Sequence, residues 1–198
     1  MGQPKALLPV PPDGSPLLLQ IFQRLQPLVD RVVVVLNEAW IAEQARLPAS
    51  VTLVADRYPE TGVLGGIATG LQACNDWAIL VACDMPFLNP RLFAHLQTLA
   101  SEPENAQDRW DAVVPFISGY AEPFHALYHR RCLPVIEQQL ARGERRANIF
   151  YPEVRLRRVE EDELRTVDPQ LRSFVNVNTP EDWQQALHVF EQHAENVL

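Results

Sequence analysis

The sequence predicts a three-layer α/β fold, in which helices cover both faces of a mostly parallel sheet. Segments with the pattern of strands alternate along the chain with segments that have the period of helices. Two of the expected strands, 31–36 and 77–83, are continuous apolar runs, as is typical of parallel strands buried on both faces. Alternation and continuous strands together favour a sheet with helices on each side. Ligands in such folds bind at the carboxyl ends of the strands.

The first half of the chain supplies three of these strands and the helices between them. Residues 15–25 have apolar side chains at helical spacing, with Ser15 as the expected N-cap and Pro16 at the first helical position. The other elements expected here are strands at 31–36, 51–55 and 77–83 and helices at 38–46, 63–74 and 90–100.

The second half continues the alternation after a polar segment, 101–109, that predicts a surface loop. Segment 154–159 alternates apolar and basic residues, which indicates a half-exposed edge strand. The last helix should start at Thr179 as N-cap, with Pro180 in the first helical position. The expected elements are strands at 111–115, 124–129, 154–159 and 173–177 and helices at 133–141, 145–150 and 179–190.

Length and composition predict one domain that spans residues 1–198. Of the 198 residues, 47% are hydrophobic and 21% are charged, as in ordinary globular proteins. No apolar run approaches the ~20 residues that cross a bilayer. The formal net charge of −8 argues against nucleic acid or an anionic membrane as the main partner. Three cysteines without a paired spacing favour free thiols in a reducing cytoplasm over disulfides or a zinc site.

Asp84 is the residue whose position says most about chemistry. It follows the apolar strand 77–83 directly, and Pro86 prevents the chain from continuing in the ladder. A carboxylate at this end of a parallel strand is well placed to hold Mg²⁺, which prefers one or two carboxylates together with phosphate oxygens and water. The competing interpretation is an Asp that caps the next turn. Asn89 supplies a better cap for the helix that follows, so we favour the metal ligand.

Segment 61–70 holds four of the chain's eight glycines, including Gly65. Because it follows strand 51–55 and opens a helix, its backbone N–H groups could face a ligand. Tight packing of the helix on the sheet would explain some of these glycines equally well. Asn37 and Asp56 also follow strands, where each alone would usually be a simple turn residue, but three consecutive strands then deliver an acid or an amide to the same sheet edge. A lysine before an apolar stretch, such as Lys5, is usually a solvated charge; near bound phosphates it would serve as a point-charge partner.

Several segments together resemble one family, the molybdenum cofactor guanylyltransferases (MobA) among the small nucleotidyltransferases. MGQPKALLPV is similar to the second half of its signature L-A-G-G-x-S-x-R-M-G-x-x-K-A-L-L-P, and ACDMPFL to its strand end C-D-M-P-F-L. TGVLGGIATGL resembles its G-P-L-A-G-I-x-x-G-L. The C-terminal half matches in order and spacing through HALYHRRCLP, ARGERR and FVNVNTPEDW. The resemblance covers essentially the whole chain and implies a Rossmann-like sheet.

The resemblance implies a role for each matching residue. Lys5 would contact the nucleotide phosphates and Asp84 would bind Mg²⁺ that bridges them. Asn37 and Asp56 would line the guanosine site, and Gly65 would belong to the nucleotide-binding residues. The residues implied on the molybdopterin side are His125, Arg145, Arg146, Asn176 and Asn178.

The reaction implied by the resemblance joins GTP to molybdopterin and gives the guanine dinucleotide cofactor and pyrophosphate. The pterin phosphate would attack the α-phosphorus in line, so the protein positions charge and needs no covalent intermediate. Molybdenum-insertion and molybdoenzyme chaperone proteins would be the further partners. Two alternatives stay open: a cytidylyltransferase for the same pterin, and a non-catalytic homologue that binds the pterin.

The chain departs from the family at its start, because Met1-Gly2 aligns with an internal Met-Gly of the signature. The family's first strand and its L-A-G-G-x-S-x-R loop would precede it. A misassigned start codon is the favoured explanation and a truly truncated protein is the other. Loss of a central strand would expose two ladder edges. The chain as written is therefore expected to be unstable and poorly active.

Overall fold

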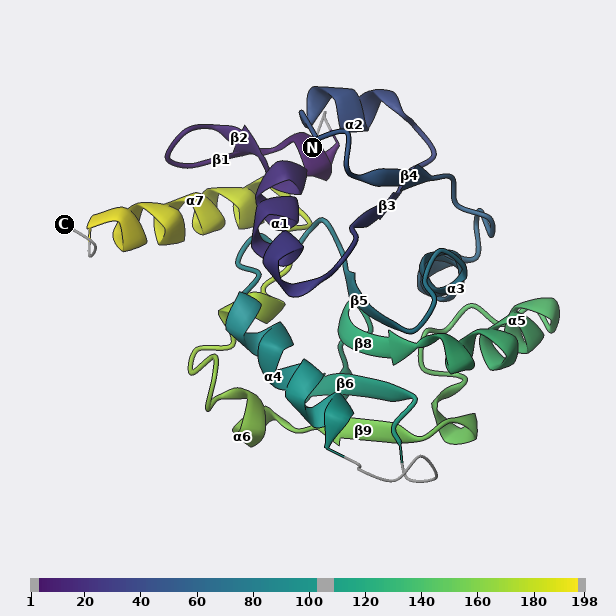
Figure 1. Cartoon of the computed structure of the whole chain (residues 1–198). Helices are drawn as coiled ribbons and strands as arrows, with labels where there is room; N and C mark the ends of the chain where they lie inside the picture. The colour runs from purple at the N-terminus through teal and green to yellow at the C-terminus, as the bar shows by residue number, and fades with distance from the viewer. Residues whose placement is uncertain (1–3, 103–108, 196–198) are drawn as a thin grey trace.

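The computed structural model describes residues 4–102 and 109–195 as three layers, with a sheet between two sets of helices (Figure 1). The strands are β1 (Pro9–Val10), β2 (Ser15–Pro16), β3 (Val33–Val35), β4 (Thr52–Val54), β5 (Trp77–Val81), β6 (Ala112–Ile117), β7 (Tyr120–Ala121), β8 (His125–His129) and β9 (Leu156–Val159). The α-helices are α1 (Leu17–Leu25), α2 (Trp40–Gln44), α3 (Gly62–Gln72), α4 (Pro90–Ser101), α5 (Leu133–Ala141), α6 (Glu161–Leu164) and α7 (Pro180–Glu195). Short 3₁₀ helices are η1 (Lys5–Leu7), η2 (Gln26–Leu28), η3 (Arg130–Cys132), η4 (Tyr151–Glu153) and η5 (Arg172–Phe174).

The main sheet has the strand order β5-β8-β6-β7, and β9 pairs with β6. β8 runs antiparallel to both β5 and β6, while β9 is parallel to β6. Strands β5, β6 and β9 therefore point the same way, and β8 is reversed between two of them. Among the described strands β9 pairs only with β6, so it is an edge strand there, as its alternating sequence predicts. The expected α/β class with a mostly parallel direction is confirmed.

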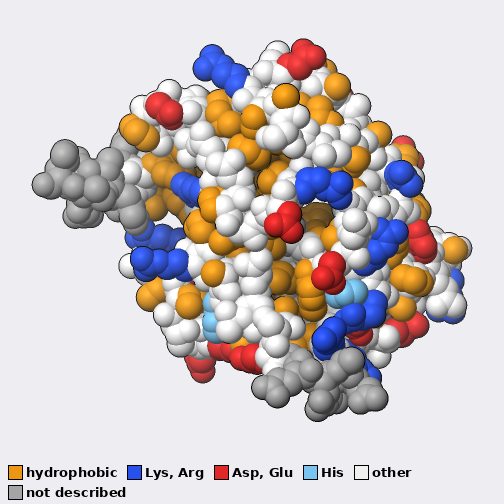
Figure 2. Space-filling model, in the orientation of Figure 1, with side chains coloured by type: hydrophobic (Ala, Val, Ile, Leu, Met, Phe, Trp, Pro, Cys, Tyr) orange, Lys and Arg blue, Asp and Glu red, His pale blue; other side chains and the backbone are white. Residues whose placement is uncertain are grey.

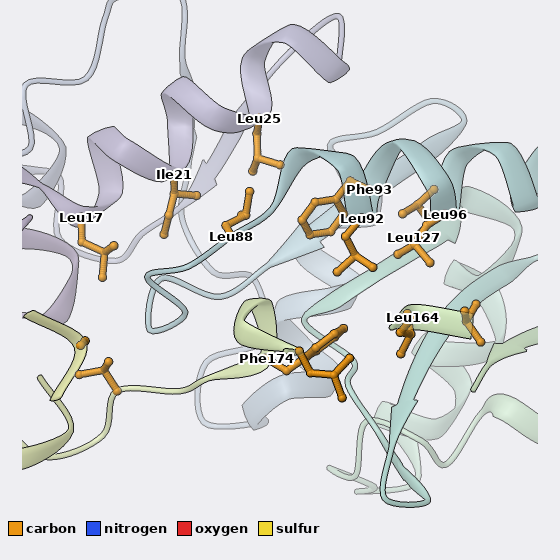
Figure 3. Packing of buried hydrophobic residues seen from close by; sticks show 14 of the residues in the cluster. Leu17, Ile21, Leu25, Leu88, Leu92, Phe93, Leu96, Leu127, Leu164 and Phe174 are labelled. Carbon is orange, nitrogen blue, oxygen red and sulfur yellow. The ribbon is translucent and has the colours of Figure 1, made fainter. Parts of the chain in front are cut away.

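Two hydrophobic cores lie on the two faces of this sheet, because successive side chains of a strand point to opposite faces. Val113 and Leu127 join the core formed with α1, α4, α6 and α7. Their neighbours Ala112 and Tyr128 join the core formed with α3 and α5. Figure 3 shows part of the first core, with Ile21 and Leu25 of α1 beside Leu88 and with Leu96 of α4 beside Leu127. Helices thus cover both faces, which gives the predicted three layers.

β3 and β4 form a second, two-stranded parallel sheet beside the main one. Within the described residues, β3 pairs only with β4, and β5 pairs only with β8. The expectation that segments 31–36 and 77–83 are buried on both faces is wrong: the valines of β3 and most of β5 are only half-buried. Figure 2 shows apolar side chains in a hollow of this face, in the region where Figure 1 places β3, α3 and β5.

At two of the three expected sites, the predicted capping residue accepts a hydrogen bond from a backbone amide in the first turn of the helix. Asn89 accepts a hydrogen bond from the Arg91 amide at 3.0 Å, and Thr179 Oγ1 accepts one from the Asp182 amide at 3.1 Å. The expected cap at Ser15 is wrong, because its hydroxyl donates instead to Asp13 Oδ2 at 2.6 Å. This bond holds Ser15 in the β1–β2 hairpin, so α1 begins two residues later.

Two further element predictions are wrong. Segment 145–150 does not form a helix: residues 147–150 are in turns, and the 3₁₀ helix η4 starts at Tyr151. Segment 173–177 is not a strand but continues from η5 into extended chain. Its start is fixed by Asp168, which accepts the Ser173 amide at 2.9 Å. Most of the expected loop 101–109 lies outside the described residues.

No helix in the described ranges is both long enough and apolar enough to cross a bilayer. The thiols of Cys74, Cys83 and Cys132 are all free, and only Cys132 is buried.

We predict that backbone amides of β3 exchange with solvent much faster than those of β8. β8 has a partner strand on each side, whereas β3 has one, so opening of β3 breaks fewer hydrogen bonds. In native-state hydrogen exchange, average protection should differ on the order of 10²-fold. Equal protection of the two strands would contradict the two-sheet description.

Candidate active site

Lys5 contacts two side chains that are far from it in the sequence. Its Nζ donates to Asn178 Oδ1 at 2.7 Å and to Asp84 Oδ2 at 3.3 Å. The Lys5 and Asp84 side chains are 30% and 27% exposed, so the ion pair faces solvent on one side. One residue predicted for each of the phosphates, the metal and the pterin side therefore belongs to one hydrogen-bonded cluster, and the other predicted pterin residues lie outside it. A cluster of a cation, a carboxylate and an amide can bind an anionic ligand together with a cation.

Asp84 is held where the chain leaves β5. Its carbonyl accepts the Val177 amide at 2.8 Å, which ties the C-terminal segment to this turn. The next residues are fixed by Arg24 of α1, whose guanidinium donates to the carbonyls of Pro86 at 2.9 Å and Leu88 at 3.2 Å. Burial lowers the pKa of Arg24. The Asp84 turn is thus clamped from two elements that are remote in sequence.

Asn178 is placed by the start of α7. The Asp182 carboxylate accepts the amides of Asn178 and Thr179, each at 2.8 Å, and its own amide donates to Thr179 Oγ1. The hydrogen bonds from the Asn178 and Thr179 amides lower the pKa of Asp182. This reciprocal cap fixes the backbone at Asn178. It leaves the Asn178 side chain free to reach Lys5.

The carboxylate of Asp84 fits the expected divalent cation. Oδ2 contacts Lys5, whereas Oδ1 is buried and has no hydrogen-bond partner among the described residues. A buried carboxylate oxygen without a partner is costly, so a cation or a donor is required there. Within the described ranges, no group of three or more His, Cys, Asp or Glu side chains could hold a metal. An ion at Asp84 would therefore rely on ligand oxygens and water, as Mg²⁺ commonly does.

Asn37 and Asp56 also come together, as expected from their positions after β3 and β4. Asn37 Oδ1 accepts the Asp56 amide at 3.0 Å. Asp56 Oδ1 accepts the Tyr58 amide at 3.0 Å and the Thr69 hydroxyl at 2.9 Å. Thr69 lies in α3, so this helix fixes the loop after β4. The pair forms a second polar cluster, on the β3–β4 side.

Gly65 lies where helix α3 packs closely against the loop before it. A Cβ added there would come within 2.8 Å of the Tyr58 carbonyl and 2.9 Å of Tyr58 Cβ, and still closer to Thr61 Oγ1. At Gly66 it would meet the Phe124 ring at 3.3 Å. The structure thus gives Gly65 a packing reason. Direct contact of its backbone with a nucleotide stays a prediction.

His125 is fully buried in β8, beside the turn that carries Asp84. Its ring lies between Phe93 and Phe174, with centroid distances of 5.1 and 5.3 Å, and has an exposed fraction of 0%. Nδ1 lies 2.7 Å from the Phe124 carbonyl, so Nδ1 carries the hydrogen, and Nε2 has no partner among the described residues. Burial lowers the pKa of His125 to about 4. The side chain does not reach the surface expected of a pterin contact.

The other expected pterin residues are exposed. Asn176 lies two residues before Asn178 in the same extended segment. Arg145 and Arg146 lie in the turns after α5, where Arg146 is 3.9 Å from Glu144. In the described part of the chain, no recorded contact joins these arginines to Lys5 or Asp84. Their role stays a prediction.

Three residues that support the two clusters were missed by sequence reasoning. Arg24 lies in an amphipathic helix, where a charged residue is expected on the surface. Thr69 was hidden among the small residues of α3. Asp182 was not singled out, although the spacing of Thr179 and Asp182 could have indicated the reciprocal cap.

The fold and these clusters define an α/β nucleotidyltransferase type of site, with a cation and a carboxylate where a mostly parallel sheet delivers its strand ends. A family model described as "MobA-like NTP transferase domain" matches residues 1–158. The chain belongs to this family.

Named relatives agree with the family. The chain is 34% identical to a molybdenum cofactor guanylyltransferase of Desulfosudis oleivorans, over 88% of this chain and 82% of the relative. It is 30% identical to a protein of the same name from Vibrio cholerae, over 94% and 85%. Among solved structures, the molybdopterin-guanine dinucleotide biosynthesis protein A of Archaeoglobus fulgidus aligns with a TM-score of 0.77 at 23% identity and covers 96% of this chain and 92% of its own. That structural likeness confirms the fold.

We predict that Gly65→Ala destabilises the protein, whereas Gly70→Ala in the same helix stabilises it. The added Cβ at Gly65 collides with backbone, but at Gly70 its nearest neighbour is Leu80 Cδ2 at 3.8 Å. Overpacking should cost about 1–3 kcal/mol at Gly65. Higher helix propensity should contribute about 0.5–1 kcal/mol at Gly70. Urea unfolding of both variants measures the difference, and opposite signs are the expected result.

Stability should fall as the pH drops from 6.5 towards 4. The folded protein keeps His125 neutral while the unfolded chain takes up a proton, so the unfolded state binds more protons in this window. The fall in pKa from 6.5 to about 4 corresponds to roughly 3 kcal/mol. The free energy of unfolding of His125→Phe should depend less steeply on pH in this range. The exposed His188, changed to Gln, is the matched control, and an unchanged slope in His125→Phe would contradict the assignment.

Proposed function

We propose that the protein transfers GMP from GTP to molybdopterin, the organic part of the molybdenum cofactor, and releases pyrophosphate. The names of its relatives support this substrate pair. The observation that carries the proposal is the contact of Lys5 with both Asp84 and Asn178 at the carboxyl end of β5. This cluster can neutralise phosphate charge and hold a cation at one point.

In the proposed reaction the terminal phosphate of the pterin attacks the α-phosphorus of GTP. The new bond is a phosphoanhydride, and the bond to the β-phosphate breaks as pyrophosphate leaves. Lys5 would donate to phosphate oxygens, and Asp84 would hold Mg²⁺. The bound ion supplies charge neutralisation when present. Asn178 keeps the Lys5 ammonium in place, since their bond is the shortest in the cluster, at 2.7 Å.

The Asn37–Asp56 cluster would line the nucleoside side of the same ligand. Asn37 contributes an amide and Asp56 a carboxylate, groups that pair with the donors and acceptors of a base or a ribose. Asn176, Arg145 and Arg146 are proposed for the pterin side, where exposed guanidinium groups suit a phosphate. The proposal includes a cytoplasmic location and transfer of the product through molybdenum-insertion and chaperone proteins.

Asp84→Asn should abolish most GMP transfer without loss of the fold. The substitution keeps the shape and a donor or acceptor for Lys5 but removes the charge that would hold the cation. The rate of pyrophosphate release with GTP and molybdopterin should fall on the order of 10²-fold or more. The thermal midpoint should change little. Activity of Asp84→Asn equal to that of the unaltered protein would refute the proposed role.

Matched controls separate the charge at Asp84 from charge in general. Asp162→Asn removes an exposed carboxylate of α6 and should leave the rate unchanged. Lys5→Met should weaken GTP binding, since it keeps the apolar stem and removes the ammonium. Competition between GTP and CTP tests the base: preference for CTP would favour a cytidylyltransferase. Binding of molybdopterin without Mg-GTP would favour a non-catalytic homologue.

A further inference from the structure

The interior next to Asp84 contains a polar donor and a polar acceptor that both lack partners. His125 Nε2 and Ser173 Oγ are buried and make no hydrogen bond with the described residues. The residues have exposed fractions of 0% each. Buried polar groups are nearly always hydrogen-bonded, so two unpartnered groups in one region require an explanation.

The two groups lie on elements that contact each other. The His125 ring packs against the Phe174 ring in a tilted arrangement, with 5.3 Å between the ring centroids, and Phe174 directly follows Ser173. Burial lowers the pKa of His125, and the charge of the Asp168 carboxylate, which accepts the Ser173 amide at 2.9 Å, opposes part of that lowering. Their chemistry is complementary. Because Nδ1 donates to the Phe124 carbonyl, Nε2 is a bare acceptor, and the Ser173 hydroxyl is a donor.

We propose that His125 is a positioning residue, whose Nε2 is linked to the Ser173 hydroxyl through one buried water and thereby holds segment 173–178 against Asp84. One bridging water satisfies both groups, which make no direct hydrogen bond with each other. The proposal assigns His125 no contact with substrate. Its influence on the proposed function passes through the segment that ends at Asn178.

A series of contacts in the structure connects His125 to the Lys5–Asp84–Asn178 cluster. Phe174 packs on the His125 ring, and the Val177 amide donates to the Asp84 carbonyl at 2.8 Å. Asn178 then reaches Lys5 at 2.7 Å. The segment starts from Leu171 in the left-handed region, at φ 52°, which a bulky side chain rarely adopts. Such a conformation persists only where surrounding contacts enforce it.

The test uses the intact chain and four variants. His125→Phe keeps an aromatic ring between Phe93 and Phe174 but removes both nitrogens. His125→Gln loses the ring but places a polar group near the Nε2 position. Ser173→Ala removes the donor, and the His125→Phe/Ser173→Ala pair closes a double-mutant cycle.

The first readouts need no substrate, so they distinguish failure of this inference from failure of the proposed function. In the unaltered protein, the ¹⁵N resonance of His125 Nε2 should show an accepted hydrogen bond, and Ser173→Ala should shift it. Hydrogen exchange at the Val177 amide should be at least 10-fold faster in His125→Phe and Ser173→Ala, with exchange at Leu127 unchanged. The double variant should be no faster than either single one, and His125→Gln should recover part of the protection.

The kinetic readout rests on the proposed function. In His125→Phe, kcat for GMP transfer should fall about 10-fold, with KM for GTP changed less than 3-fold, because the segment loses its position and the nucleotide residues remain. Unchanged exchange at Val177, additive effects in the cycle, or a His125 resonance insensitive to Ser173→Ala would each overturn the inference. If the unaltered protein shows no transfer at all, the proposed function fails while the exchange results still decide the role of His125.

Discussion

β8 lies between β5 and β6 and is hydrogen-bonded to both. Its antiparallel pairing with β5 therefore fixes the position of His125 relative to the Asp84 turn. Five consecutive residue pairs join it to β5, from Trp77 with His129 to Val81 with His125. This register brings His125 level with the last residue of β5, just before the Asp84 turn. It also divides the side chains of the sheet between the two cores. A slip of one residue would exchange these faces and remove His125 from the turn.

Much of the fold could be predicted from the sequence, because the spacing of apolar residues and the positions of turn and cap residues indicated the same helices and strands. The position of Asp84 after an apolar strand and before Pro86 was enough to place it at a ligand-binding edge. The meeting of Lys5 with Asp84 and Asn178 came from the family resemblance, since no local pattern reports a contact between residues 173 positions apart. The resemblance also named His125, but only the structure shows that its ring is buried and that its Nε2 has no hydrogen-bond partner in the described ranges.

The misjudged segments share a physical cause: a specific hydrogen bond, ring contact or strand pairing overrides the pattern from which the element was predicted. Ser15 has the composition of an N-cap, yet the neighbouring Asp13 captures its hydroxyl. Segment 173–177 is apolar enough for a strand, yet Asp168 and the His125 ring hold its first residues in a 3₁₀ turn. The half-buried state of β3 likewise depends on its having β4 as its one strand partner within the part of the chain that the structure describes, which a run of valines does not indicate.

The close packing at Gly65 bears on how the two polar clusters are held relative to each other. No recorded sheet hydrogen bond in the described ranges joins β3 to β5, but helix α3 contacts both strands. α3 also supplies Thr69, which grips Asp56 on the β4 loop. The helix therefore acts as a strut between the Asn37–Asp56 side and the Asp84 side. A ligand that contacts both clusters depends on the fixed distance that the helix maintains between them. A change at Gly65 that loosens the packing of α3 would therefore weaken binding of such a ligand, but not of a ligand that contacts one cluster.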